Sequence, residues 1–234
     1  MTALILQGRI DSNRLPEKSL LPLGGEPMIF RVMEALKTVP CDVHVLACPE
    51  DCLVPFGPLA ERAGFEIFGG SKQDVLYRYC AALRRFKADR LIRATGDNPF
   101  VFADAAAAIN REAAALNADY AGYSGLPYGA GVESVSAEAL FRAEREAMAC
   151  PEREHVCPYL YGHPEKFLIH RPLAPLRWQN PELRFTVDTW EDYDRARFLY
   201  EVLNQEAPGE DRYRGATIIA AFLHAPVPAE ILLR

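Results

Sequence analysis

Short apolar runs alternate with longer amphipathic stretches through the first half of the chain. Four of these mostly apolar runs look like buried strands, and they cover residues 3–7, 43–47, 66–68 and 90–94. Each run is followed by a turn signal and then by residues with helical periodicity. This alternation predicts a three-layer α/β fold, in which a mostly parallel sheet carries helices on both faces.

Two of the amphipathic stretches predict well-defined helices. Residues 73–86 place their apolar side chains on one face, namely Val75, Leu76, Tyr79, Cys80 and Leu83. The arginines of this stretch, at positions 78, 84 and 85, are expected on its other faces. Residues 103–116 are rich in alanine, which has the highest helix propensity of the common residues.

The strand–helix rhythm breaks after residue 117. The elements expected beyond it are strands at 118–123, 132–135 and 184–187, a Gly/Pro-rich loop at 124–131, helices at 137–148 and 152–162, and a helical tail from 191 interrupted at 207–215. The chain contains no internal repeat and no long linker. We therefore expect a single domain over residues 1–234, with a small β-containing insertion at about 118–175.

The amino-acid composition limits which partners and which cellular location we expect. Half of the 234 residues are hydrophobic, and 26 basic against 32 acidic residues give a net charge of −6. This mildly acidic balance argues against nucleic acid as a partner, but a local basic cluster can still bind a small anion. The apolar run at 3–6 is too short for a signal peptide or a membrane span, so we expect a soluble cytoplasmic protein.

Six cysteines lack the paired C-x-x-C spacing of a metal site. We expect them to be free thiols in or near the core. Zinc held by Cys48 and Cys52 is the alternative, and it would need two further ligands.

The loop at 7–18 is the clearest candidate for binding chemistry, since it leaves the carboxyl end of the first predicted strand. A triphosphate carries about four negative charges, and this loop offers three cations at spacings of five and four residues, Arg9, Arg14 and Lys18. Gly8 and Ser12 allow close approach of the backbone. The segment lacks the Walker pattern, and an ordinary solvated loop is the alternative.

Asp97 is a candidate metal ligand. It follows a glycine at the end of an apolar strand, and Mg²⁺ is commonly held by one or two carboxylates together with phosphate oxygens. A helix cap for the segment after Pro99 is the alternative. Asp192 and Asp194 form a D-x-D pair inside a predicted helix, where they face different directions, so we interpret both as surface charge.

The opening loop reads Q-G-R-x-x-S-x-R-L-P-x-K from Gln7 to Lys18, with L-P-L-G-G-E-P-M at 21–28. It resembles the cytidylyltransferases that make CMP-activated acidic sugars, such as the CMP-ketodeoxyoctonate and CMP-sialic acid synthetases, and most closely the spore coat polysaccharide biosynthesis protein F branch. Gly8 replaces the usual alanine. Glu17 replaces a common glycine, and an acidic side chain near the expected phosphates counts against the resemblance unless it points to solvent.

Two further segments extend the resemblance. G-S-x-x-D-V-L-x-R-Y at 70–79 is similar to an element that lines the nucleotide site in this family, which implies roles for Ser71, Asp74, Val75 and Arg78. Ser71 would also suit a helix N-cap with Asp74 three residues on. The turn containing Gly96 and Asp97 resembles G-D-x-P, and 186–192 resembles T-V-D-T-x-E-D. The resemblance implies that Asp97 and Asp188 hold one Mg²⁺ between them.

Two segments after residue 130 resemble the acceptor pocket and dimer contact of the family. They contain Glu133, Glu154 and His155, with Cys157 in place of the usual threonine. A packed polar residue is an equal alternative for His155. Three aromatic residues nearby are interpreted as core rather than as stacking platforms, Tyr159, Tyr161 and Phe167.

The resemblance implies a nucleotide-diphospho-sugar-transferase-like fold and a Mg²⁺-dependent transfer of CMP from CTP to a small acidic sugar, with release of pyrophosphate. The catalytic residues would be Arg9, Lys18, Asp97 and Asp188, and a homodimer is expected. Two alternatives stay open: another nucleotide or a phosphonate or polyol phosphate acceptor, and a non-catalytic nucleotide-binding protein of the same fold. A glycosyltransferase depends on the D-x-D pair alone and ranks last.

Overall fold

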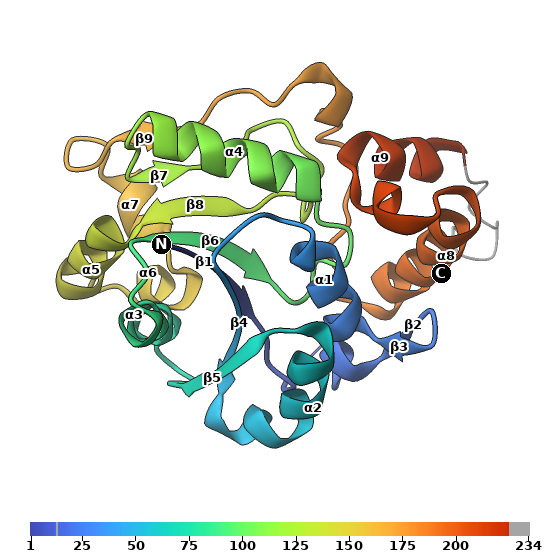
Figure 1. The fold of residues 1–234 in the computed structure, drawn as a ribbon, viewed down its shortest axis with the longest axis horizontal. Helices are drawn as coiled ribbons and strands as arrows, with labels where there is room; N and C mark the ends of the chain where they lie inside the picture. The colour runs from blue at the N-terminus through green and yellow to red at the C-terminus, as the bar shows by residue number, and fades with distance from the viewer. Residues whose placement is uncertain (13, 225–234) are drawn as a thin grey trace.

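A seven-stranded sheet organises the molecule (Figure 1), and the computed structural model describes residues 1–12 and 14–224. Its order is β5-β4-β1-β6-β8-β7-β9. The parallel half consists of β1 (Thr2–Gln7), β4 (Val43–Pro49), β5 (Glu66–Gly70) and β6 (Arg90–Thr95). The other half consists of β7 (Tyr120–Ala121), β8 (Glu133–Ser136) and β9 (Ile169–His170), with β8 antiparallel to both neighbours. The mostly parallel α/β fold is confirmed.

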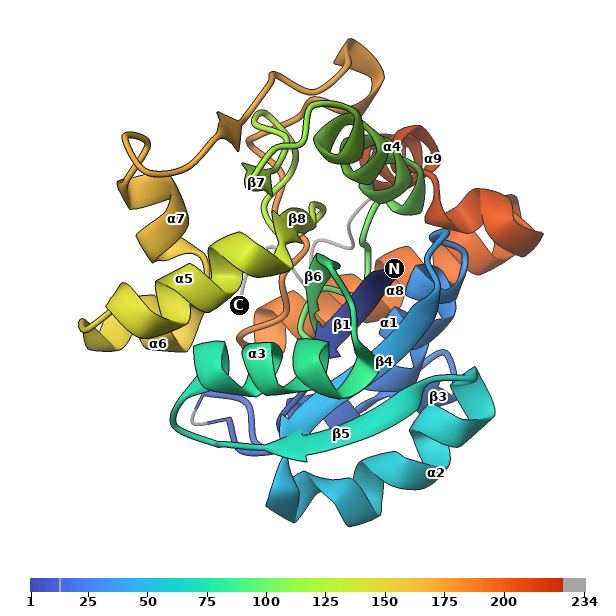
Figure 2. The ribbon, with the colours of Figure 1, turned by 60° about the vertical axis from the view of Figure 1, so that its left-hand side comes forward.

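Helices cover both faces of the sheet (Figures 1 and 2). The main helices are α1 (Met28–Lys37), α2 (Leu53–Ala63), α3 (Val75–Phe86), α4 (Ala103–Ala115), α5 (Ala137–Glu146), α8 (Trp190–Glu206) and α9 (Gly215–His224). Alternation along β1 decides which face each residue joins: Ala3 and Ile5 pack with α3 and α5, whereas Leu4 and Leu6 pack with α1, α2 and α4. Two apolar cores thus sandwich the sheet.

A third apolar cluster anchors the tail. Side chains of α8 and α9 pack with Leu15 of the first loop, Leu23 and Phe185. Leu23 belongs to a short hairpin of β2 (Pro22–Leu23) and β3 (Glu26–Pro27), and Figure 1 shows α8 beside it. This cluster joins α8 and α9 to the loop that follows β1. No helix in the described residues is long and apolar enough to cross a membrane.

The start of α3 differs from the sequence-based expectation. The N-cap is Asp74, whose side chain accepts a hydrogen bond from Tyr77 N at 2.9 Å, and Ser71 lies one turn earlier, accepting from Asp74 N at 3.0 Å. Arg78 was expected away from the apolar face, but it is 1% exposed and its Nη1 donates to Ser71 O at 2.6 Å. Gly70 makes room, because a Cβ there would meet Arg78 Cγ at 2.9 Å.

Two elements expected in the second half are different in the structure. The helix expected at 152–162 is two short helices, α6 (Cys150–His155) and α7 (Pro158–Gly162), because Val156 between them has a φ of 75°. Residues 184–187 are an extended segment outside the sheet, which forms an isolated bridge between Arg184 and Tyr128. Four 3-10 turns complete the described elements: η1 (Lys18–Leu20), η2 (Glu50–Cys52), η3 (Leu176–Trp178) and η4 (Gly209–Tyr213).

Candidate functional site

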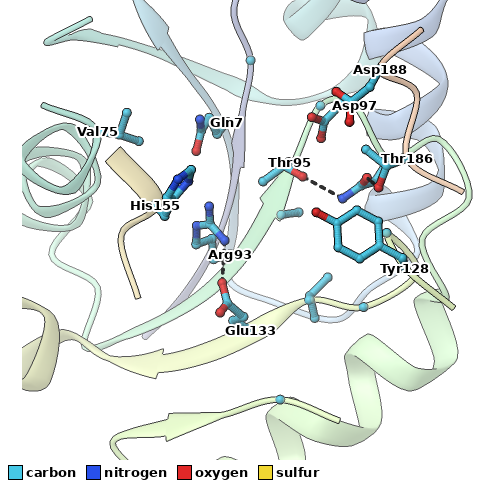
Figure 3. Close-up of a pocket in the computed structure, with 18 of the residues that line it drawn as sticks. Gln7, Val75, Arg93, Thr95, Asp97, Tyr128, Glu133, His155, Thr186 and Asp188 are labelled. Carbon is cyan, nitrogen blue, oxygen red and sulfur yellow. Dashed lines mark hydrogen bonds and ion pairs between the residues drawn. The ribbon is translucent and has the colours of Figure 1, made fainter. Parts of the chain in front are cut away.

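A cavity of about 840 Å³ opens at the carboxyl ends of β1 and β6, where ligands bind in open α/β sheets (Figure 3). Most of the residues singled out in the sequence line it: Gln7, Gly8, Arg9, Ser12, Arg14, Lys18, Val75, Arg78, Gly96, Asp97, Glu133, Glu154, His155 and Asp188. Residues from the first loop, from α3 and from the segment after residue 120 therefore face one space.

Ser71 and Asp74, by contrast, are outside the lining. Asp74 is already engaged, because besides capping α3 it accepts hydrogen bonds from Nε of Arg153 at 2.8 Å and from its Nη2 at 2.5 Å. These contacts join the start of α3 to α6, the helix that carries His155. Ser71 and Asp74 support the cavity wall from behind.

The first loop is held at several points. Gly8 continues the sheet, since its N donates to Ala47 O at 3.1 Å, and a Cβ there would meet Phe56 at 3.2 Å. Ser19 Oγ donates to Arg9 O at 2.7 Å, and buried Leu15 fixes the middle of the loop. Glu17 adopts a φ of 52° and is exposed, so this acidic residue does not count against the resemblance.

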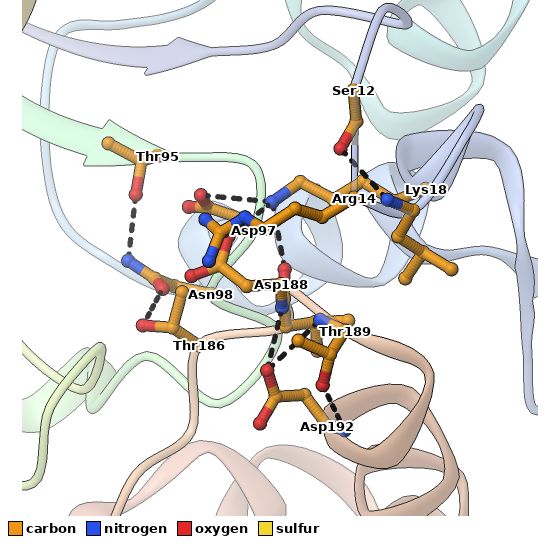
Figure 4. A network of polar contacts seen from close by, with 12 residues as sticks. Ser12, Arg14, Lys18, Thr95, Asp97, Asn98, Thr186, Asp188, Thr189 and Asp192 are labelled. Atoms are coloured by element: carbon orange, nitrogen blue, oxygen red, sulfur yellow. Dashed lines mark hydrogen bonds and ion pairs between the residues drawn. The ribbon is translucent and has the colours of Figure 1, made fainter.

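Lys18 brings the two key carboxylates together (Figure 4). Its Nζ lies 3.0 Å from Asp188 Oδ1 and 3.4 Å from Asp97 Oδ2, and it also donates to Val187 O at 2.8 Å. Arg14 Nη2 lies 3.0 Å from the same Asp188 oxygen. Two aspartates 91 positions apart in the sequence thus converge on a single cationic position.

Electrostatics keep Asp188 ionised. Burial alone would raise the pKa of this carboxyl group, but the hydrogen bond and charge of Lys18, with the charges of Arg14 and Arg184, bring the pKa below its ordinary value. A charged carboxylate at neutral pH is the form that binds a cation.

A backbone hydrogen bond fixes the distance between the two aspartates, because Val187 N donates to Asp97 O at 2.9 Å. Side chains reinforce this link. Thr186 Oγ1 donates to Asn98 Oδ1 at 2.8 Å, and Asn98 Nδ2 donates to Thr95 Oγ1 at 2.7 Å. The segment expected as a strand therefore reaches the site by pairing with the turn after β6.

The interpretation of the D-x-D pair was wrong for Asp192. This residue is 7% exposed, and its Oδ2 accepts hydrogen bonds from Asp188 N at 3.0 Å and Thr189 N at 3.1 Å. Thr189 Oγ1 accepts in turn from Asp192 N at 3.2 Å, which completes a capping box at the start of α8. Asp192 therefore holds the backbone of Asp188, whereas Asp194 is partly exposed on the surface.

The far end of the cavity contains a buried ion pair that sequence reasoning missed. Arg93 Nη1 donates to Glu133 Oε2 at 2.5 Å, and Tyr120 OH donates to Glu133 Oε1 at 2.9 Å. Burial alone would lower the pKa of Arg93, but the charge of Glu133 raises it above the ordinary value. Glu133 is thus already paired, and Arg93 joins it in the wall.

Three residues beside this pair complete that end of the cavity. Glu154 and His155 are exposed and line the cavity from α6. Tyr161 was expected in the core, but it lines the cavity and is 41% exposed. Tyr159 and Phe167 are buried, as expected.

Three buried polar atoms of the cavity wall have no hydrogen-bond partner among the described residues, Gln7 Oε1, Arg78 Nε and Arg93 Nε. Burial also lowers the pKa of Arg78. Buried polar groups in native proteins are normally paired with protein, water or a bound ligand. This wall therefore has the character of a polar ligand site.

Comparison with known proteins identifies the family. The family model for cytidylyltransferases matches residues 3–213. The chain is a member of the cytidylyltransferase family.

Among the relatives of this cytidylyltransferase is the spore coat polysaccharide biosynthesis protein SpsF of Bacillus subtilis. The two are 32% identical over 206 residues, which cover 84% of this chain and 85% of the relative. The resemblance found in the sequence motifs is confirmed.

Solved structures of low sequence identity share the fold. A cytidylyltransferase from Leptospira borgpetersenii superposes with a TM-score of 0.84 at 21% identity, over 97% of this chain and 98% of that one. CMP:2-keto-3-deoxy-manno-octonic acid synthetase in complex with CTP gives 0.67 at 16% identity, over 88% and 99%. Rv0371c from Mycobacterium tuberculosis in complex with manganese gives 0.59 at 16% identity, over 83% and 96%.

Proposed function

We propose that this cytidylyltransferase transfers CMP from CTP to a hydroxyl group of a small acidic sugar of the 2-keto-3-deoxy type, with release of pyrophosphate and with Mg²⁺ as cofactor. One observation carries the proposal. Asp97 and Asp188 converge on one cationic position, and the cationic first loop lies beside them in the same cavity.

The first loop would bind the nucleotide. Arg9 and Arg14 can grip phosphate oxygens, and Lys18 Nζ is the point charge best placed for the reacting α-phosphate. Close approach of the backbone is possible at two glycines, Gly8 and Gly96. Gln7 and Ser12 add polar contacts on the same side of the cavity.

The base and ribose would lie toward α3. Val75 and Arg78 form that wall, with Ser71 and Asp74 behind it. Arg78 is a buried cation with an unpaired Nε, so a polar base edge or a phosphate oxygen at this wall would compensate part of its desolvation.

The donors present fit a magnesium ion, because Mg²⁺ takes one or two carboxylates and completes its shell with phosphate oxygens and water. Asp97 and Asp188 would hold it. Such an ion supplies Lewis-acid neutralisation of phosphate charge. The protein itself contributes mainly positioning, which is worth up to about 7–11 kcal/mol when the reacting groups are aligned.

The acceptor would occupy the end of the cavity lined by Glu133, Glu154 and His155. His155 can donate a hydrogen bond to a carboxylate or hydroxyl oxygen. Arg93 lines the same wall, where Glu133 neutralises its charge, so the choice of an acidic acceptor rests on the family resemblance.

The proposal includes a cytoplasmic homodimer. Three leucines of the segment after α7 are 55–84% exposed, namely Leu168, Leu173 and Leu176. Exposed apolar side chains that gather in one segment favour a protein interface. All six cysteines are free, which fits a reducing compartment. Light scattering after size exclusion measures the assembly, and a monomeric mass across the concentration range would contradict the dimer.

The test of function combines binding and turnover. CTP with Mg²⁺ should raise the melting temperature more than ATP, GTP or UTP, and a panel of 2-keto-3-deoxy sugar acids should release pyrophosphate, detected as phosphate after pyrophosphatase. Asp97→Asn and Asp188→Asn should each lose at least about 100-fold in turnover, as expected for removal of a transition-state contact. Asp194→Asn is the matched surface control.

Two results would overturn this proposal. Equal stabilisation by all four nucleotides would remove the assignment to CTP. CTP binding without pyrophosphate release from any acceptor of the panel would favour the non-catalytic alternative.

A further inference from the structure

The two oxygens of Asp188 have different partners. Oδ1 faces Lys18 and Arg14 of the first loop, each at 3.0 Å. Oδ2 accepts a hydrogen bond from Arg184 Nη2 at 2.6 Å. One oxygen is thus turned toward Asp97 and the cavity, and the other is tied to a residue that lies behind the cavity wall.

Arg184 is itself held from two sides. Its guanidinium carbon lies 4.7 Å from the centre of the Tyr128 ring, and its Nε lies 3.8 Å from Asp192 Oδ1. The backbone adds a second link, because Tyr128 N donates to Leu183 O at 2.9 Å and Phe185 N donates to Tyr128 O at 2.8 Å. A guanidinium stacked on an aromatic ring loses less freedom when it forms a hydrogen bond.

We propose that Arg184 is a positioning residue, which dedicates Asp188 to binding the metal ion through Oδ1 alone, and that Tyr128 holds Arg184 in place. This inference rests on the proposed function, because it assumes that Asp188 is a metal ligand. The hydrogen bond from Arg184 opposes rotation of the carboxylate, so Oδ2 stays turned away while Oδ1 keeps the position that Lys18 and Arg14 share. Asp188 then offers one fixed oxygen opposite Asp97, which suits the strict geometry of Mg²⁺.

Tyr128 gives this arrangement a connection to the rest of the cavity. It belongs to the loop between β7 and β8, it is 62% exposed, and it lines the cavity. Figure 3 shows its ring between Glu133 on one side and Asp188 on the other. The same side chain therefore faces the ligand space and supports the residue that orients a metal carboxylate.

The test measures metal affinity directly, with Mn²⁺ as the probe. The full chain saturated with CTP is titrated with Mn²⁺, and the concentration of free Mn²⁺ is measured by electron paramagnetic resonance. Arg184→Met keeps the side-chain stem but removes the donor, and we expect Mn²⁺ affinity to fall about tenfold. Arg184→Lys keeps the charge without the planar fork and should give an intermediate loss.

Tyr128 provides a matched pair of variants. Tyr128→Ala removes the stacking ring, and it should weaken Mn²⁺ binding about two- to fivefold. Tyr128→Phe keeps the ring and should leave Mn²⁺ affinity unchanged. CTP affinity without metal, measured on the same samples, should stay within error for Arg184→Met, because Arg184 does not line the cavity. Melting temperatures of the same samples show whether a loss of Mn²⁺ affinity accompanies a loss of stability.

The outcomes separate this inference from the proposed function. If the wild-type chain binds no Mn²⁺ with CTP, the metal assignment and the inference both fall. If the wild type binds Mn²⁺ and Asp188→Asn abolishes binding, while Arg184→Met binds normally or more tightly, only the positioning role is refuted. A fall in melting temperature with unchanged Mn²⁺ affinity would likewise reduce Arg184 to a structural role.

Discussion

The ion pair between Arg93 and Glu133 offers a test of how this fold tolerates charge inside its core. The two side chains are only 15% and 20% exposed, and Tyr120 donates to the same carboxylate. Removing one partner leaves the other as an uncompensated, mostly buried charge in the cavity wall. Removing both leaves no charge to compensate. The two kinds of change should therefore have different costs.

The magnitude follows from the burial of the pair. Breaking a buried ion pair costs about 3–5 kcal/mol, and the residual exposure of both groups places each single variant near the lower end, at about 3 kcal/mol. Arg93→Met and Glu133→Gln are suitable because glutamine still accepts the hydrogen bond from Tyr120. Two independent losses would sum to about 6 kcal/mol. We expect the double variant to cost about 3 kcal/mol or less, a coupling of about 3 kcal/mol.

The assay is unfolding in urea followed by tryptophan fluorescence and circular dichroism, whose transitions must coincide for the two-state analysis to hold. Thermal melts provide a second readout, and each single variant should lower the melting temperature by about 6–12 °C. A double variant whose cost lies within about 0.5 kcal/mol of the sum would refute the reasoning, because it would show that the two charges do not depend on each other.

Three further predictions concern stability. Gly129→Ala should cost about 2–4 kcal/mol, because its φ is 90° and an added Cβ would collide with the extended segment at 186; thermal melts measure this. Asp192→Ala should lower the free energy of unfolding in urea by about 2–3 kcal/mol, because it removes the N3 carboxylate of the capping box and takes the acceptor from the partly buried N–H groups of Asp188 and Thr189. Hydrogen bonds to Glu146, of which the one from Arg142 has the largest effect, lower the pKa of its carboxyl group to about 2. The ionised carboxylate therefore stabilises the folded protein, and Glu146→Gln should lower the melting temperature at pH 7. That difference should shrink as the pH falls from about 4.5 toward 2.

Controls for these variants are available in the same chain. Gly25 also has a positive φ, of 81°, but a Cβ added there would have no atom within 4 Å. Gly25→Ala therefore measures the cost of backbone strain without a collision. Asp194→Ala leaves the capping box intact and should change stability by less than about 0.5 kcal/mol. The first prediction is contradicted if Gly129→Ala destabilises the protein no more than Gly25→Ala. The second is contradicted if Asp194→Ala destabilises it as much as Asp192→Ala, and the third if the effect of Glu146→Gln on the melting temperature does not depend on pH.

The parallel half of the sheet was predictable because its strands are mostly apolar runs, each followed by residues with helical periodicity. The meeting of Asp97 with the first loop was predictable for a related reason. Both follow strands whose carboxyl ends lie at one edge of the sheet, since β1 pairs in parallel with β6. Local motifs combined with this rule of topology were enough to gather most of the cavity wall.

The remaining features depend on packing between distant segments. Residues 184–187 have the composition of a strand, but their partners are the backbone of Tyr128 and of Asp97, which no local pattern reveals. Arg78 is buried because Gly70 of β5 leaves space for its side chain. The periodicity of the α3 sequence carries no information about space left by a residue in β5. Arg93 did leave a signal, because a charged residue at an inward position of a central strand needs a partner. The spacing of Thr189 and Asp192 was a second signal, a capping box.

The dependence of the site on the tail has a consequence for biosynthesis. The last strand of the sheet ends at His170, whereas Asp188 and the helix that holds it come later and dock through the third apolar cluster. During translation the sheet can therefore form before the carboxylate opposite Lys18 has left the ribosome. A nascent chain with a finished sheet therefore still lacks one of the two carboxylates that we propose hold the metal, and it gains that group only after the sheet is complete.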